Sequence, residues 1–239
     1  MDFKEFEVFF EKELNKNNLN VKKESYIKFY NYMKKVLDWN TKINVTAVRD
    51  EENFIIKHFI DSLMINKYVE GNLKVIDIGT GAGFPGIPVK LYNEDLQITL
   101  IDSINKKLNV IRDSIIGLDL KNIDVIHSRA EDLAIKPEYR EMFDVSTTRA
   151  VSNLSTILEY MMPFIKVGGR AVCMKGPNYQ EELENARAAI KILGGQIEVI
   201  ENFNINTEYE RNIIVIKKIK ETPKKFPRSG NKPLKEPIH

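Results

Sequence analysis

The stretch that most constrains this chain is KVIDIGTGAGFPGIPVKL at residues 74–91, where an apolar run breaks into glycines and then resumes with helical character. Glycine adopts positive φ freely and lets the backbone approach a ligand closely. A strand, a glycine turn and a helix in that order are typical of the first unit of a doubly wound α/β sheet, which binds ligands beyond the carboxyl ends of its strands. The stretch therefore predicts a ligand site at Gly79 and Gly81.

The rest of the chain after residue 74 alternates short apolar runs with helical stretches, as a doubly wound, mostly parallel sheet requires. The runs are KVIDIG, QITLID, IDVIHS, MFDVSTT, RAVCMKG, QIEVIENF and NIIVIKKI. Only NINTEYER separates the last two, which is too short for a helical crossover. We expect an α/β fold with a Rossmann-like sheet of seven strands and an antiparallel hairpin at one edge.

Three regions follow from these patterns. Residues 1–70 carry apolar side chains at helical spacing and predict an N-terminal helical region, and residues 71–220 hold the sheet. Residues 221–239 form a basic tail with four prolines, too poor in large apolar residues to fold by burial of its own. An extended cationic arm with one aromatic side chain, Phe226, suits a phosphate backbone, so we expect this tail to contact RNA or DNA.

The composition argues against a secreted, a membrane-spanning or a metal-binding protein. The N-terminus carries acids where a signal peptide carries bases, and no apolar run approaches the ~18 residues of a membrane span. We therefore expect a cytoplasmic monomer without membrane contact. Three histidines and the single cysteine, Cys173, argue against a metal site, and the net charge of +2 does not by itself indicate nucleic acid.

Two ligand classes use a glycine turn of this kind. Gly81, Gly83 and Gly86 fit the G-x-G-x-x-G pattern of dinucleotide sites, but a lone match is weak. Asp77 lies two residues before the first glycine, and at 4 Å its charge would repel a pyrophosphate by about 4 kcal/mol. The same carboxylate would attract the cationic methionyl end of S-adenosylmethionine. This pattern therefore favours S-adenosylmethionine over NAD.

Further candidate side chains lie at the ends of the second and third runs. Asp102 ends the second run, where an acid accepts both ribose hydroxyls in either cofactor class; its alternative is to cap the following helix. The third run ends in HSRAEDL, where the adenine is expected. Arg129 occupies a position that often holds an acid, so Glu131 or the backbone at Ala130 would have to bind the base. The alternative for Glu131 is a helix start.

Eight motifs, in this order along the chain, resemble one known family. They are NVTAV at 44–48, HFIDSL at 58–63, DIGTGAGFPGIP at 77–88, LIDSINKK at 100–107, RAED at 129–132, FDVSTTRAV at 143–151, GGRAVCMKG at 168–176 and KKFPRSGNKPLKEPI at 224–238. The chain from about residue 40 to its end is similar to the RsmG family, also called glucose-inhibited division protein B. These proteins are bacterial methyltransferases of guanine N7 in 16S ribosomal RNA.

The resemblance implies a class I methyltransferase fold, S-adenosylmethionine as cofactor, and a loop in the decoding region of the small ribosomal subunit as substrate. It implies cofactor contacts at five positions: Gly79, Phe84, Ala130, Glu131 and Arg149. For Arg149, which follows the fourth run, we expect a cation that binds the methionyl carboxylate or an RNA phosphate.

The motifs absent from the chain narrow the chemistry. The fourth run is not followed by the [DNS]-P-P-[YFW] motif of amine methylation, and Cys173 lacks the preceding proline of pyrimidine C5 enzymes. Guanine N7 has a free lone pair and loses no proton, so positioning suffices and we assign no general base. His58 and Asp61 are spaced to meet on one helix, where a docking contact is favoured over a catalytic pair.

For the RNA we expect phosphate contacts from Lys175 and Arg228, and base stacking on Phe84 or Phe226. Three alternatives stay open from the residues. They are a small-molecule methyltransferase, an NAD-dependent oxidoreductase, and a nucleic-acid binding module with a vestigial pocket.

Overall fold

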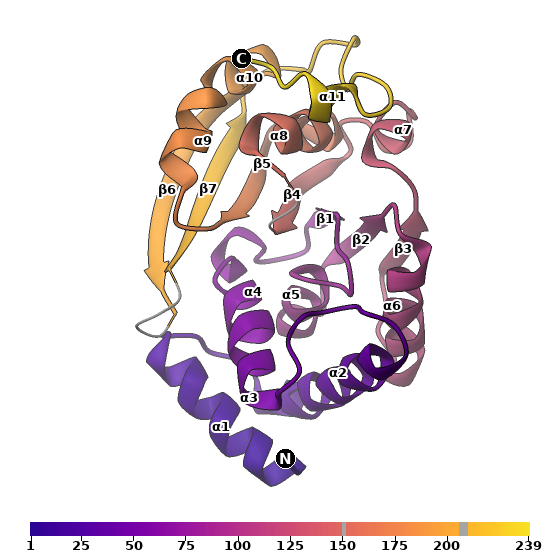
Figure 1. The fold of residues 1–239 in the computed structure, drawn as a ribbon, viewed down its shortest axis with the longest axis vertical. Helices are drawn as coiled ribbons and strands as arrows, with labels where there is room; N and C mark the ends of the chain where they lie inside the picture. The colour runs from indigo at the N-terminus through magenta and orange to yellow at the C-terminus, as the bar shows by residue number, and fades with distance from the viewer. Residues whose placement is uncertain (150–151, 206–209) are drawn as a thin grey trace.

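The computed structural model describes residues 1–149, 152–205 and 210–239, and its centre is a seven-stranded sheet in the order β3-β2-β1-β4-β5-β7-β6 (Figure 1). The strands are β1 (Lys74–Ile78), β2 (Gln97–Asp102), β3 (Ile123–His127), β4 (Phe143–Arg149), β5 (Ile165–Lys175), β6 (Gly195–Asn204) and β7 (Glu210–Lys218). The first five pair in parallel, whereas β7 runs antiparallel to β5 and β6. The predicted seven strands and edge hairpin are confirmed.

The sheet is buried on both faces, which explains why its central runs are continuously apolar. Successive residues of β7 show the alternation: Ile213 and Val215 join one hydrophobic core, and Ile214 and Ile216 join the other. Two helical layers therefore enclose the sheet.

Helices of the N-terminal region and of the first two crossovers cover one face. They are α1 (Phe3–Lys16), α2 (Lys23–Lys42), α5 (Gly86–Tyr92), α6 (Asn105–Gly117) and a helix that runs from α3 (Glu51–Phe54) through π-helical η1 (Ile55–Ile60) to α4 (Asp61–Leu63), followed by the short turn η2 (Asn66–Tyr68). The other face carries α7 (Ala130–Ala134), α8 (Leu154–Met161), η3 (Met162–Phe164), α9 (Tyr179–Asn185) and α10 (Arg187–Ile192). Within the described ranges, none of the helices combines the length and apolarity that a bilayer crossing needs.

The N-terminal helices share one core with the sheet and reach the glycine turn. Phe6, Phe10 and Phe59 are buried in that core, as the helical spacing predicted. The Tyr32 hydroxyl of α2 donates a hydrogen bond to the carbonyl of Ala82 inside the turn. At Gly83, φ is +93°, and a Cβ would lie 2.5 Å from the Tyr32 hydroxyl. The packing of α2 thus requires glycine at this position.

The basic tail is folded onto the domain and ends in a short helix, α11 (Lys232–Lys235), which contacts α8 (Figure 1). Phe226 is 6% exposed and belongs to the second core. Arg228 forms an ion pair of 2.6 Å with the fully buried Glu159. Our expectation of an extended arm was wrong, because the domain supplies the apolar surface and the buried acid that the tail itself lacks.

Phe226→Ala measures how firmly the tail is folded. Truncating a buried phenylalanine removes its packing, so we expect the free energy of unfolding to fall by about 3 kcal/mol. Urea denaturation of the full chain gives the value, and Lys224→Ala, an exposed position two residues away, is the matched control. Equal stability of both variants and the unmodified protein would show that the tail does not pack.

Candidate functional site

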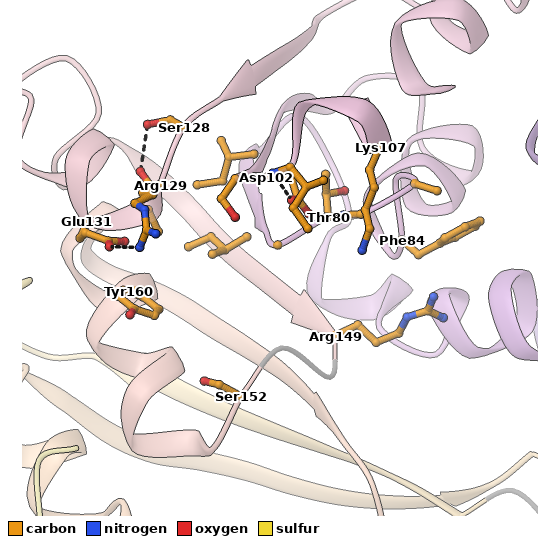
Figure 2. A pocket seen from close by; sticks show the side chains of 18 of the residues that line it. Thr80, Phe84, Asp102, Lys107, Ser128, Arg129, Glu131, Arg149, Ser152 and Tyr160 are labelled. Carbon is orange, nitrogen blue, oxygen red and sulfur yellow. Dashed lines mark hydrogen bonds and ion pairs between the residues drawn. The ribbon is translucent and has the colours of Figure 1, made fainter. Parts of the chain in front are cut away.

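A cavity of about 620 Å³ lies beyond the carboxyl ends of β1, β2, β3 and β4. Figure 2 shows its two ends, with Arg129, Glu131 and Tyr160 at one end and Phe84 and Arg149 at the other. The loops after all four strands contribute to the lining. This is the position where doubly wound sheets bind their ligands.

The glycine turn forms the floor between the two ends. Gly79 and Gly81 line the cavity with φ of 69° and 60°. The backbone N–H groups of Gly79 and Thr80 both donate to the carbonyl of Ile101, each at 3.0 Å. The turn is therefore tied to the end of β2, and its two glycines leave backbone rather than side chain exposed to a ligand.

Asp77 lies beneath this turn and does not line the cavity. Its carboxylate is fully buried and accepts three hydrogen bonds: from Thr80 Oγ1 at 2.6 Å, from the Gly86 backbone N–H at 3.1 Å and from Thr147 Oγ1 at 3.0 Å. Our expectation that this acid meets the ligand at the rim of the site is corrected. Asp77 shapes the turn from below and ties it to β4.

Asp102 does line the cavity, and both of its oxygens are oriented by backbone donors. The Gly81 N–H donates to Oδ2 and the Ile104 N–H donates to Oδ1, each at 2.8 Å. Each carboxylate oxygen accepts more than one hydrogen bond, so capacity for two ribose hydroxyls remains. The alternative of a cap on α6 is not met, because the N-cap residue is Ile104, whose side chain makes no capping hydrogen bond.

The loop from β3 into α7 forms the end of the cavity beside Tyr160. Ala130 and Glu131 both line it, as expected, and Glu131 is buried. Arg129 Nη1 lies 3.3 Å from Glu131 Oε1 and donates to Asn231 Oδ1 at 2.9 Å. Arg129 therefore joins the predicted adenine end to the tail, a link that the sequence did not indicate.

Arg149 lies at the other end of the cavity, beside Phe84. It reaches across to the N-terminal helices, where Nη1 donates to Asp61 Oδ2 at 3.0 Å and Nη2 bonds His58 Nδ1 at 2.9 Å. Its guanidinium carbon lies 5.1 Å from the centre of the Phe84 ring, and His58 stacks on the same ring at 4.3 Å. The predicted docking contact of His58 and Asp61 is thus made through Arg149, which uses three of its five N–H donors for His58, Asp61 and the carbonyl of Lys57.

His58 is uncharged in this setting. Burial, with Arg149 and Lys57 nearby, lowers the pKa of His58 to about 2. The neutral ring therefore accepts from Arg149 at Nδ1 and donates from Nε2 to Thr46 Oγ1 at 2.7 Å. With both nitrogens engaged, His58 positions Arg149 and Phe84 and is unsuited to proton transfer.

Several lining residues escaped the sequence reasoning. Lys107 extends from α6 into the cavity near Phe84 (Figure 2), and Thr46, Tyr160, Asn231 and Leu234 also line it. Lys107 and Thr46 lie inside motifs that carried the family resemblance, as do the two tail residues. Tyr160 lies outside those motifs, and only the three-dimensional structure brings it to the site.

The comparisons with known proteins agree with this geometry. The family model described as GidB, rRNA small subunit methyltransferase G, matches residues 25–214. A protein of Acetivibrio thermocellus named ribosomal RNA small subunit methyltransferase G is 47% identical over 222 residues, which cover 92% of this chain and 91% of that protein. One of the same name from Clostridium novyi is 43% identical and covers 92% of both chains.

This chain belongs to the GidB family.

Solved structures agree on the fold of this GidB chain. The M. jannaschii TYW2 structure in complex with AdoMet has a TM-score of 0.54 at 17% identity, over 66% of this chain and 74% of that one. The M. jannaschii fibrillarin pre-rRNA processing protein has a TM-score of 0.54 at 14% identity, over 69% and 76%. The class I methyltransferase fold is therefore confirmed, and the S-adenosylmethionine cofactor is confirmed by the methyltransferase family to which the chain belongs. The predicted contact of Asp77 with the ligand does not contribute to this assignment, because Asp77 does not line the cavity. The NAD alternative is set aside.

Three of the residues expected to contact RNA, namely Lys175, Arg228 and Phe226, contact other parts of the protein instead. The Lys175 ammonium lies 2.7 Å from Glu182 and donates to the carbonyl of Ser152, and its side chain is 5% exposed. Arg228 is held by Glu159, and Phe226 is in the core. These partners could not be predicted, because the sequence showed only that Lys175 ends a strand and that the tail is basic. Accessible cations lie instead at Lys106, Lys232 and Lys235, which have no carboxylate at ion-pair distance within the described part of the chain.

The lining offers little to a metal ion. Among the residues that the structure describes, no three His, Cys, Asp or Glu side chains are grouped to hold one.

Asp77→Asn tests the buried carboxylate beneath the turn. Burial raises the pKa of Asp77 from 3.8 to about 6 against the opposing effect of its hydrogen bonds. This folded-state pKa lies above the unfolded value, so protonation of Asp77 stabilises the folded protein. That stabilisation is complete below about pH 4 and is lost as the pH rises through 6. The amide cannot ionise, so the wild type should lose about 3 kcal/mol of stability relative to the variant between pH 4 and 7.

Urea unfolding at a series of pH values measures this difference, with the exposed Asp132→Asn as control. Since the carboxylate is buried and does not line the cavity, the affinity of Asp77→Asn for S-adenosylmethionine should change little. Parallel stability profiles, or a large loss of affinity in a folded variant, would contradict this assignment of Asp77.

Proposed function

We propose that this protein transfers the methyl group of S-adenosylmethionine to N7 of a guanine in 16S ribosomal RNA of the small subunit. The observation that carries the proposal is the match of residues 25–214 to a family of rRNA small subunit methyltransferases, with a cavity at the position where that fold binds its cofactor. We further propose that it acts in the cytoplasm, where its ribosomal RNA substrate is found, and that it acts as a monomer.

The residues present fit this cofactor, which supplies an electrophilic methyl group when bound. Asp102 offers acceptor capacity for the ribose hydroxyls, and the backbone of Gly79 and Gly81 admits close approach. Ala130 and Glu131 would hold the adenine end. Phe84 and Arg149 would then lie at the methionyl end, where the guanidinium, oriented by His58 and Asp61, favours a carboxylate or phosphate.

The chemistry asks little of these side chains. Guanine N7 attacks with a lone pair that is free at neutral pH, and no proton leaves. The work of the chain is therefore to hold N7 in line with the bond between methyl and sulfur. A neutral His58 with both nitrogens engaged agrees with a reaction that needs no general base.

Methyl mapping of 16S rRNA tests the activity directly. Primer extension or mass mapping of RNA from a strain lacking the gene should show one missing N7-methylguanine, restored by the intact gene. Gly79→Val should fail to restore it, because φ of 69° strains a β-branched residue where the ligand must approach. An unchanged methylation pattern in the deletion strain would refute the proposal.

The rival acceptor is a small molecule, and surface charge separates the two. Replacing Lys232 and Lys235 with Gln removes two accessible cations near the cavity mouth, so rRNA methylation should fall and become less dependent on salt. The control pair is Lys4 and Lys12 on α1, at the opposite end of the molecule (Figure 1). Equal activity of both double variants on rRNA across a salt series would show that Lys232 and Lys235 do not contact the RNA, whereas no rRNA methylation by the unmodified protein would favour the small-molecule acceptor.

A further inference from the structure

The C-terminal tail reaches the cavity from the face opposite α6. Asn231 and Leu234 line the same cavity as Asp102 and Ala130, although the sequence places them about a hundred residues later. Both come from the segment 226–236, which we call the C-terminal wall. It lies at the end of the cavity where the adenine is proposed.

The C-terminal wall is pinned on both sides of Leu234. Thr156 Oγ1 of α8 donates to the carbonyl of Pro233 at 2.9 Å, and Arg228 Nη2 donates to the carbonyl of Glu236 at 2.8 Å. Arg228 is itself held by Glu159, and Asn231 accepts from Arg129. A segment with these anchors has a defined position beside the cavity, which a loosely attached arm would not have.

The side chain of Leu234 is exposed to solvent, although hydrogen bonds hold the backbone on both sides of it. It is 56% exposed, and Ile104, which also lines the cavity from the loop before α6, is 49% exposed. Leu234 and Ile104 line the same cavity, so together they give it an exposed apolar surface that a ligand can cover. The planar base of a nucleoside has an apolar surface of its own, and Asp102 beside Ile104 offers the ribose contacts.

We propose that the C-terminal wall completes the cofactor site and that Leu234 covers the nucleoside half of S-adenosylmethionine. This inference rests on the proposed function of the cavity. It gives the tail a task in cofactor binding that is separate from any contact of Lys232 and Lys235 with RNA. Truncating the tail would then remove part of the cofactor site as well as positive charge.

Calorimetric titration of the full chain without RNA tests the inference. The probes are S-adenosylhomocysteine and 5′-methylthioadenosine, which lacks the amino-acid end. Leu234→Ala should weaken both by about tenfold, because the removed carbons no longer cover the base. Leu234→Met, which keeps an apolar side chain of similar length, should restore most of the affinity. Ile135→Ala, at an apolar residue 62% exposed outside the cavity lining, is the matched control and should change neither.

The outcomes separate this inference from the proposed function. If the unmodified protein binds neither probe, the cavity is not the cofactor site and both proposals fail. If it binds both and Leu234→Ala binds them equally well, the function stands and the C-terminal wall is refuted as a ligand contact. A loss confined to S-adenosylhomocysteine would overturn the placement of Leu234 at the nucleoside. Circular dichroism of each variant confirms that it is folded.

Discussion

The site depends on one buried carboxylate. Asp77 accepts hydrogen bonds from Thr80 and Gly86 in the turn and from Thr147 on the neighbouring strand, and so fixes the shape of the glycine turn without lining the cavity. Removing an acid from water is costly, and its raised pKa expresses that cost. The three donors offset it in part, and the result is a rigid floor for the cavity.

Other parts of the chain support this floor from separate directions. Tyr32 packs under the turn from the N-terminal helices, whereas Arg149 ties the end of β4 to His58 and Asp61 on the same helical layer. The C-terminal wall closes the far end through Arg129 and Asn231. Segments at both termini are therefore structural parts of the site, and the central sheet alone does not complete it.

The sequence predicted the sheet well because its signals are local. Continuous Ile- and Val-rich runs, a glycine turn and a missing crossover each reflect the conformation of a few residues, and all seven strands and the edge hairpin are where those signals placed them. Gly79, Gly81 and Asp102 were predicted for the same reason, since a position at a strand end fixes their place in space.

Predictions that depended on long-range partners were less successful. Nothing near Asp77 indicates that it lies beneath the turn, and nothing in the tail indicates Glu159 or the apolar pocket for Phe226. Lys175 likewise looked accessible until Glu182 was placed beside it. A charged residue can be assigned to a strand end from sequence, but whether its charge faces a ligand or a buried partner depends on the packing of distant segments.

A crystal structure of the complex with S-adenosylhomocysteine would test this account most directly. We predict ribose hydroxyls on Asp102, the base between the loop at Ala130 and the C-terminal wall, and Asp77 still bonded to Thr80 beneath the turn. A ligand in direct contact with the Asp77 carboxylate, or seated outside this cavity, would contradict the account.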